Sequence, residues 1–454
     1  MIASNSIHRL TTIAACCLAL GTQAADEDLL GRDALFGDDL PKASSTPRDN
    51  SPGIKGFIQF EAARTTANPE HWSKLRTRAE LGSSGKLSES LKWKLGARFD
   101  YDFVYGINDH YPADVERNQR YNVELRENYL DYSTGNWDFR LGKQHVVWGE
   151  MVGLFFADVV SARDLREFIL PEFDQMRTTQ WAARAEYFVG DFHAELLWVP
   201  VASYDNIGKP GAEFYPYQPT FGLTNVLYRG EKRPERDAEN MNYGLRLSTL
   251  KNGWDISGFY YRSSDISPTF YRTVIDPTPI TGTIEYQARH DRIHQYGATV
   301  SKDFGDIVFK AEGVYTRGRS FTTLDLADTD GVVRQNTFDW AAGLDFTFPA
   351  ETRFNVQFFQ RYFANHNSGL IPEKHENGYS LLLNNKFFNN WEAQALLISS
   401  LNRSDWLFRP RLSWNFQRNW RWVIGADVFH GPQSGMFGRY DSMDRAYSEI
   451  RYSF

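Results

Sequence analysis

Polar and apolar residues alternate with a period of two along most of this chain. The clearest stretch is LKWKLGARFDYDFVY (residues 91–105), where every second side chain from Leu91 to Tyr105 is apolar or aromatic and most of the others are charged. Because successive residues of a strand point to opposite faces, this pattern predicts a β-strand with one apolar and one charged face. The stretch is also longer than the strands of most globular sheets. The same alternation recurs at residues 74–81, 338–348, 406–414 and 420–428.

The connections between the predicted strands alternate between short and long. Short turns are expected at residues 83–90, 134–136, 189–191, 251–253, 303–306, 349–351, 388–390 and 417–419, and long polar loops at 201–240, 262–290, 317–337 and 363–377. This sorting is typical of an outer-membrane barrel, whereas a soluble sandwich has no reason to produce it. A closed barrel also bonds every backbone polar group inside the membrane. We therefore predict an all-β fold, a closed antiparallel transmembrane β-barrel of about 18 strands with short periplasmic turns and long extracellular loops.

The N-terminal residues indicate export. Residues 1–25 combine a single positive charge, Arg9, with an apolar core and small residues before the expected cleavage point, which is typical of a signal peptide. The apolar run is too short to span a membrane as a helix. Both cysteines, Cys16 and Cys17, lie inside this segment, and a lipoprotein-like box before Cys16 is disfavoured by the apolar residues that follow it. Residues 26–52 are expected to form a periplasmic extension, and residues 53–454 the barrel.

The C-terminus supports the same location. The chain ends RAYSEIRYSF, with apolar or small residues on one face and the aromatic Phe454 in last place. This ending resembles the signal read by the machinery that inserts outer-membrane barrels, which we expect as a partner through Phe454. The expected surroundings are outer-membrane lipid and lipopolysaccharide. The formal net charge of −7 is mildly acidic and argues against nucleic acid as a partner.

A barrel of this size has a lumen, and the inward positions of its predicted strands are rich in arginine. The candidate pore-lining residues are Arg98, Arg140, Arg353, Arg361, Arg409, Arg411 and Arg421. They could pair with acids on neighbouring strands. Alternatively, the five from Arg353 onward, which have fewer acids nearby in the sequence, could form a basic wall that favours anionic solutes.

Residues 142–177 (GKQHVVWGEMVGLFFADVVSARDLREFILPEFDQMR) interrupt the alternation. They follow the strand predicted at 137–144 and should join the fifth and sixth strands on the long-loop side. Ser161 could cap a short helix that runs to about Phe168 and ends at Pro171. Such a half-apolar segment could fold into the lumen and narrow it, or cap the outer mouth. Its candidate constriction residues are Arg163, Asp164, Arg166, Glu167, Glu172, Asp174 and Arg177.

Three stretches of this region carry a family resemblance: LGKQHVVWGE (141–150), ADVVSARDLREFILPE (157–172) and YFVGDFHAELLWVP (187–200). They resemble a proteobacterial outer-membrane β-barrel family catalogued as a domain of unknown function and often encoded beside RND-type exporters. The resemblance covers the predicted mature chain. It implies a barrel that handles hydrophobic or amphiphilic compounds, and an RND-type transporter system as a partner.

Together these observations predict an outer-membrane channel or transporter for hydrophobic or amphiphilic, and in particular anionic, small molecules. Two alternatives stay open: a structural or assembly barrel working with RND-type export partners, and an outer-membrane lipid-modifying enzyme. The enzyme would need a nucleophile beside a histidine, and the pattern places none next to His145 or His193. We therefore expect no catalytic residue, no cofactor and no metal; residues 325–331 (DLADTDG) lack the full ligand set of a calcium loop.

Overall fold

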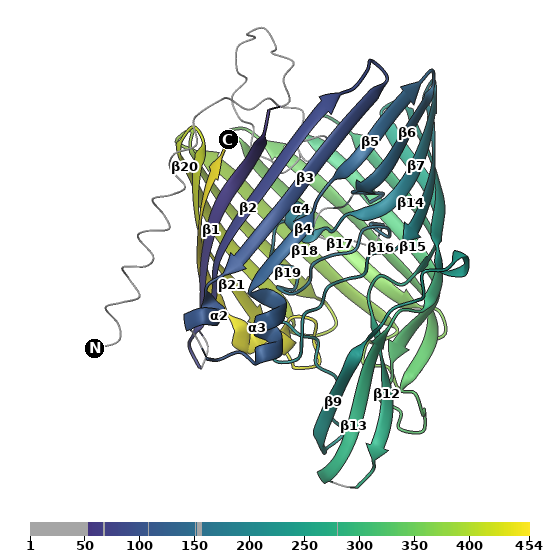
Figure 1. Cartoon of the computed structure of the whole chain (residues 1–454), viewed down its shortest axis with the longest axis vertical. Coiled ribbons are helices and arrows are strands. Elements are labelled where there is room, and N and C mark those ends of the chain that lie inside the picture. Colours follow the sequence, from purple (N-terminus) through teal and green to yellow (C-terminus); the bar gives the residue numbers. More distant parts are fainter. Residues whose placement is uncertain (1–52, 67–68, 108, 150, 152–156, 279) are drawn as a thin grey trace.

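The computed structural model describes residues 53–66, 69–107, 109–149, 151, 157–278 and 280–454, and these form a β-barrel (Figure 1). Among them, one sheet of 19 strands closes on itself through β1 and β22. Its strands are β1 (Lys55–Thr65), β2 (Trp72–Lys86), β3 (Leu91–Asp102), β4 (Tyr121–Leu125), β5 (Asn128–Thr134), β6 (Trp137–Gln144), β7 (Gln180–Val189), β8 (Phe192–Val201), β10 (Asn242–Lys251), β11 (Trp254–Ser264), β14 (Arg292–Asp303), β15 (Ile307–Thr322), β16 (Val332–Phe348), β17 (Thr352–Phe363), β18 (His375–Phe387), β19 (Trp391–Ser400), β20 (Trp406–Gln417), β21 (Trp420–His430) and β22 (Arg445–Ser453).

Two short strands share one position in the wall. Both β4 and β5 pair with β3, separated by a break at Arg126 and Glu127, so together they complete a single crossing. The described residues thus form an antiparallel barrel of 18 crossings, as the sequence predicts. The barrel closes where Phe57 of β1 lies opposite Ser453 of β22. With β4 and β5 counted as one crossing, each crossing pairs with a neighbour on both sides, which removes the exposed edges that hydrocarbon would not tolerate.

Strand β3 shows how the alternation becomes a membrane wall. Its outward residues Leu95, Phe99 and Tyr101 are exposed, whereas Arg98 and Asp100, which face the lumen, are only 3% and 8% exposed. The apolar face therefore meets lipid, and the charged face is covered from the inside. The predicted strand at 91–105 ends early, because the Asp102 side chain accepts a hydrogen bond from the Val104 backbone N–H (3.0 Å) and the short helix α2 (Val104–Ile107) follows.

The connections are sorted by length, as predicted. The short turns gather at the upper end in Figure 1, beside the C-terminus, and the long connections gather at the lower end. The long connections hold the helices α3 (Ala113–Gln119) and α4 (Phe173–Met176) and the 3₁₀ helices η3 (Ala238–Asn240) and η4 (Gly438–Met443). A closed barrel with an exposed apolar band and this asymmetry is an outer-membrane barrel, and the long-loop end is its extracellular end.

A second, smaller sheet projects beyond the extracellular end (Figure 1). It consists of β9 (Leu223–Lys232), β12 (Thr269–Asp276) and β13 (Ile280–Arg289), with β13 pairing antiparallel to β12 and parallel to β9. The prediction of plain loops at 201–240 and 262–290 was therefore wrong. These strands pack one face, including Phe270, Ile284 and Tyr286, against other extracellular loops, and no lipid requires their other face to be apolar.

The predicted signal peptide (1–25) and the predicted extension (26–52) both lie outside the described residues. Among the helices that the structure does describe, no helix has both the length and the apolar character needed to cross a bilayer.

Candidate functional site

The connection between β6 and β7 is described at residues 145–149, 151 and 157–179, and these residues lie inside the extracellular half of the barrel and contact several parts of its wall. The predicted helix from Ser161 to Phe168 was wrong: the helix of this connection is α4, which begins after Pro171. Ser161 does not cap a helix, because its hydroxyl donates to the Val146 backbone carbonyl (2.8 Å). Instead of forming a helix, the backbone at Arg163 pairs with that at Arg177 in an isolated antiparallel β-bridge. We call residues 157–179 the inserted segment.

Glu167 ties the inserted segment to β2 and β22. Its carboxylate contacts Lys74, lies 2.7 Å from Arg76 Nη1 and is 3.4 Å from Arg445 Nη1. All four side chains are largely buried, with 5–15% of each exposed. Burial alone would raise the pKa of Glu167, but the three cations outweigh it and hold the pKa well below the usual range. Glu167 is therefore ionised at any physiological pH.

Glu172 makes an equivalent contact with β20, β21 and β22. Its Oε1 lies 2.9 Å from Arg411 Nη2 and 3.3 Å from Arg421 Nη2, and its Oε2 lies 3.7 Å from Arg451 Nη2. Burial would raise the pKa of Glu172, but Arg411, Arg421 and Arg451 hold it well below the usual range. The Glu172 side chain is still 39% exposed, so it faces open space in the lumen as well as the wall.

The backbone of the inserted segment is also bound by wall arginines. Arg409 donates to the Leu170 carbonyl (2.6 Å), and Arg98 to the Gln175 carbonyl (2.7 Å). Arg126, at the break between β4 and β5, donates to the carbonyls of Arg177 (2.7 Å) and Asp174 (2.5 Å). Guanidinium groups are suited to this task because each presents several donors in a fixed plane.

Other walls of the barrel hold the start of the same connection. Glu312 on β15 accepts hydrogen bonds from the backbone N–H groups of Met151 and Ala157, at 3.2 Å each. Trp148, which is 1% exposed, donates from Nε1 to Glu195 on β8 (3.1 Å). The connection therefore crosses the lumen from β8 and β15 to β2 and β22.

Apolar packing completes the attachment. Leu170 of the inserted segment is buried in a cluster with residues of the extracellular ends of β19, β20 and β21 and of the loop before β22; its members are Phe214, Ile398, Leu407, Phe429, Phe437 and Tyr440, with Phe168 and Ile169 packed against them. Phe168 has a positive φ of 54°, an uncommon conformation for a residue with a large side chain, and its ring lies 4.9 Å from that of Tyr440. The strain at Phe168 is offset by this burial.

The remaining predicted constriction residues mostly stabilise the segment itself. Asp164 pairs with Arg166 (2.5 Å), and Arg177 with Asp158 (2.8 Å). Arg163 is 3.5 Å from Asp205 of the next loop. Of the seven predicted side chains, Glu167 and Glu172 form ion pairs with the barrel wall.

The prediction that the arginines of the late strands form a basic wall with few acids nearby was wrong. Arg361 pairs with Asp339 (2.5 Å) and Arg409 with Asp427 (2.7 Å), so acids are close even where the sequence suggested few. The sequence could not show that Glu172 would face Arg411 and Arg421, because those residues are 239 and 249 positions further along the chain. Arg140 pairs with Asp131 (2.6 Å) on the neighbouring strand, away from the inserted segment. Arg353 lies at the short-turn end of β17.

Four cations at this site were missing from the candidate set: Lys74, Arg76, Arg445 and Arg451. All four lie at inward positions of their strands, which the alternation of polar and apolar residues could have identified. Phe454, Tyr452 and Ile450 share the outward face of the last strand, so Arg451 and Arg445 fall on the inward face.

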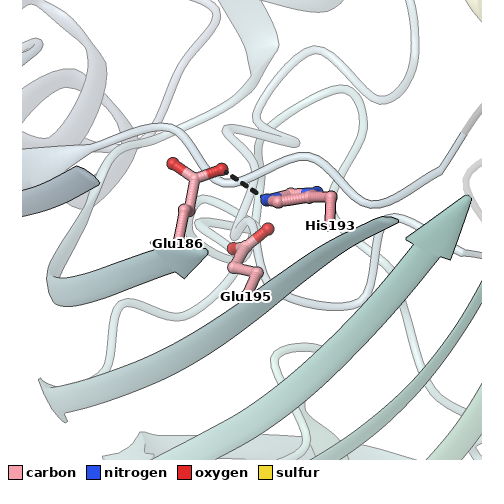
Figure 2. A group of neighbouring side chains, drawn as sticks. All are labelled: Glu186, His193 and Glu195. Atoms are coloured by element: carbon pink, nitrogen blue, oxygen red, sulfur yellow. Dashed lines mark hydrogen bonds and ion pairs between the residues drawn. The ribbon is translucent and has the colours of Figure 1, made fainter. Parts of the chain in front are cut away.

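A separate cluster of ligand-type side chains lies on β7 and β8 (Figure 2). Glu186, His193 and Glu195 have potential ligand atoms within 4.8 Å of one another, the one such group among the described residues. His193 Nε2 is 3.1 Å from Glu186, and its Nδ1 is 3.2 Å from the Ser248 hydroxyl. The carboxylates already have partners: Arg184 lies 2.8 Å from Glu186, and Trp148 donates to Glu195. Ser248 is a hydroxyl beside His193 that the sequence pattern did not place.

Comparison with known proteins shows the family of this chain. A family model described as "Protein of unknown function (DUF1302)" matches residues 66–428, most of the chain. The chain belongs to this family. No curated protein matches the sequence. Membership agrees with the resemblance noted above, while the expected link with RND-type exporters stays a prediction.

Solved structures with a similar chain course include two bacterial outer-membrane proteins. OmpF of Salmonella typhi, solved in a complex with daunomycin, is 11% identical, with a TM-score of 0.43 and coverage of 89% of this chain and 98% of that one. OmpT of Vibrio cholerae is 10% identical, with a TM-score of 0.43 and coverage of 90% and 100%.

Proposed function

We propose that this DUF1302 protein is an outer-membrane channel for small molecules with a polar head, in which the inserted segment forms the constriction. The observation that carries the proposal is that Glu167 and Glu172, both from the inserted segment, face cations of the wall inside the lumen. The function of the segment would be to narrow the passage at a level where carboxylates of the segment pair with cations of the wall.

Glu172 is 39% exposed and lies beside Arg411 and Arg421, so this part of the constriction would present both signs of charge to a passing solute. A charged head group would exchange contacts with these side chains while the apolar body of the solute passes them. The proposal for amphiphilic solutes rests on this paired-charge surface together with the family resemblance. In the wild-type channel, Glu172 neutralises part of the charge of the wall arginines, so the preference for anions should be weak. The preference should become strong when that carboxylate is removed.

Reversal potentials in planar bilayers test this proposal. Glu172→Gln keeps the shape of the side chain but uncovers Arg411 and Arg451, so the selectivity of the channel should shift toward anions. Asp131→Asn is the matched control, because it also breaks a lumenal carboxylate–arginine pair but leaves the inserted segment untouched. Equal reversal potentials for Glu172→Gln and the control would refute the constriction.

Deletion of residues 157–177 provides a coarser test. Conductance should rise and solute discrimination should fall, provided that the deleted protein still folds, which its mobility on unheated gels would show. If the intact protein had no conductance and instead co-purified with export partners, the structural or assembly alternative would replace the channel.

We also propose that the protein is not an enzyme. Ser248 and His193 lie on lumenal faces near the short-turn end, whereas an enzyme that modifies membrane lipid needs its nucleophile at the lipid boundary. The purified protein should therefore not hydrolyse phospholipid esters. Hydrolysis that vanished in Ser248→Ala or His193→Ala would overturn this.

A further inference from the structure

The outer wall carries a row of aromatic side chains near the extracellular end of four neighbouring strands. Tyr260 of β11 lies opposite Tyr296 of β14, which lies opposite Tyr315 of β15, which in turn lies opposite Phe338 of β16. Tyr296, Tyr315 and Phe338 are among the exposed hydrophobic residues. Because the chain crosses lipid here, this row forms part of an aromatic girdle.

The spacing along β15 places this girdle at the membrane surface. Ile307 begins the strand at the short-turn end, and Tyr315 is eight residues further on. At about 3.3 Å per residue, this is about 26 Å along the strand, and about 20 Å along the barrel axis after a tilt of 35–45°. The apolar band of such barrels is about 25 Å tall. Residues one step beyond Tyr315 therefore lie at the level of lipid headgroups.

The outward positions at this headgroup level hold a row of cationic and histidine side chains. Arg262 of β11 lies opposite His294 of β14, and His294 lies opposite Arg317 of β15. Each is two residues beyond an aromatic residue of the girdle on its own strand, and the Tyr260 hydroxyl is 2.9 Å from His294 Nδ1. Arg292 and Arg334 stand beside this row. An open groove of about 510 Å³ is lined by Arg292, His294, Arg317 and Arg334 together with Tyr260 and Tyr296.

The positive charge of this surface is poorly neutralised. Arg262 and Arg292 donate to backbone carbonyls of the turn at 239–241, the closest being 2.6 Å from Arg292 to the Glu239 carbonyl. Among the described residues, neither forms an ion pair, and neither does Arg317, which is exposed. Arg334 is 4.0 Å from Asp291 and 71% exposed, so that pair is weak. Lumenal arginines, by contrast, are closely paired with carboxylates.

We propose that this surface binds the phosphate groups of an outer-leaflet glycolipid of the lipopolysaccharide type. Guanidinium groups form strong charge-assisted hydrogen bonds with phosphate oxygens, and three arginines converge on one groove. The aromatic row directly below offers an apolar surface for the acyl chains of the same molecule. A free phosphate ion would use the cations but gain nothing from the aromatic row.

Binding of the phosphorylated lipid to the full-length protein in detergent tests the proposal. The probes are bis-phosphorylated lipid A, the same lipid without phosphates, and inorganic phosphate, with bound lipid counted by native mass spectrometry. Lipid A should bind, and the phosphate-free lipid should bind far more weakly. Arg317→Gln/Arg334→Gln, which removes two of the three arginines that line the groove, should weaken lipid A binding by roughly tenfold for each lost charge-assisted contact.

Arg403→Gln is the matched control, since Arg403 is also at the extracellular end but is paired with Glu376 (2.5 Å). It should leave lipid binding unchanged. Equal lipid A binding by wild type and the double variant would overturn the proposal, as would equal weakening in the control. Displacement of lipid A by equimolar inorganic phosphate would overturn the lipid as the ligand. Heat-modifiable gel mobility confirms that each variant is folded.

Discussion

Replacing Glu167 with Gln removes the charge that joins the inserted segment to β2 and β22. Breaking one side of a buried ion pair costs about 3–5 kcal/mol when the remaining charges are left unpaired. Here the loss is smaller, because Lys74 and Arg76 keep their contacts with Glu61, and Arg445 keeps Asp427. We expect about 2 kcal/mol, which is about 30-fold in the equilibrium between a docked and an undocked segment.

Single-channel recording measures this equilibrium as time spent at a higher conductance. Glu167→Gln should increase that time about 30-fold over wild type, while Asp131→Asn should not increase it. Because the pKa of Glu167 is lowered, its stabilising contribution is fully present above the ordinary value of 4.5 and is lost only as the pH falls through the lowered pKa. Docking should therefore not change between about pH 8 and about pH 5. A segment that undocks in that window, or a Gln variant that behaves like the control, would refute the reasoning.

Two further predictions concern the extracellular loops and the packing beneath the inserted segment. The hydrogen bond that protonated His71 donates from Nε2 to the Glu213 carboxylate (2.7 Å) raises the pKa of His71. This contact therefore stabilises the loops fully below pH 6.5, and its contribution is lost as the pH rises through the raised pKa. Hydrogen exchange around His71 should speed up on that rise, and His71→Gln should abolish the pH dependence. Gly244→Ala would place a Cβ 2.6 Å from Trp148 Cη2 and 2.8 Å from a backbone oxygen, and should lower the unfolding free energy by about 1–3 kcal/mol. Gly258→Ala, whose nearest neighbour is 3.9 Å away, should change it by less than about 0.5 kcal/mol in the same unfolding assay.

The barrel itself was predictable because lipid and water enforce the alternation at every crossing. The strand predicted at 137–144 is observed with the same bounds, Trp137–Gln144, and its outward residues Trp137, Phe139 and Leu141 are apolar. The small sheet of β9, β12 and β13 buries one set of residues, such as Ile284 and Tyr286, against other extracellular loops rather than facing lipid, so its strands were hidden among long polar stretches.

The location of the inserted segment was predicted correctly, but its conformation was not. Its half-apolar pattern suggested a helix, yet Leu170 and Phe168 are covered by side chains from β19 to β21 rather than by neighbours along a helix. Contacts such as Glu172 with Arg411 join positions that are far apart in the chain and depend on how the closed wall curves. Local patterns carry no information about that curvature.

The seam between the first and last strands has a consequence for how the chain could be rewired. Gly56 and Phe454 exchange two backbone hydrogen bonds of 2.9 Å, so the first strand and the final residue meet at the short-turn end. A circular permutant that joins these ends and opens instead at the turn after β16 would keep every pairing of the wall. It would also move Phe454 from the end of the chain into a hairpin. Such a permutant would separate two roles that coincide in the natural chain, closing the barrel and presenting a terminal aromatic residue.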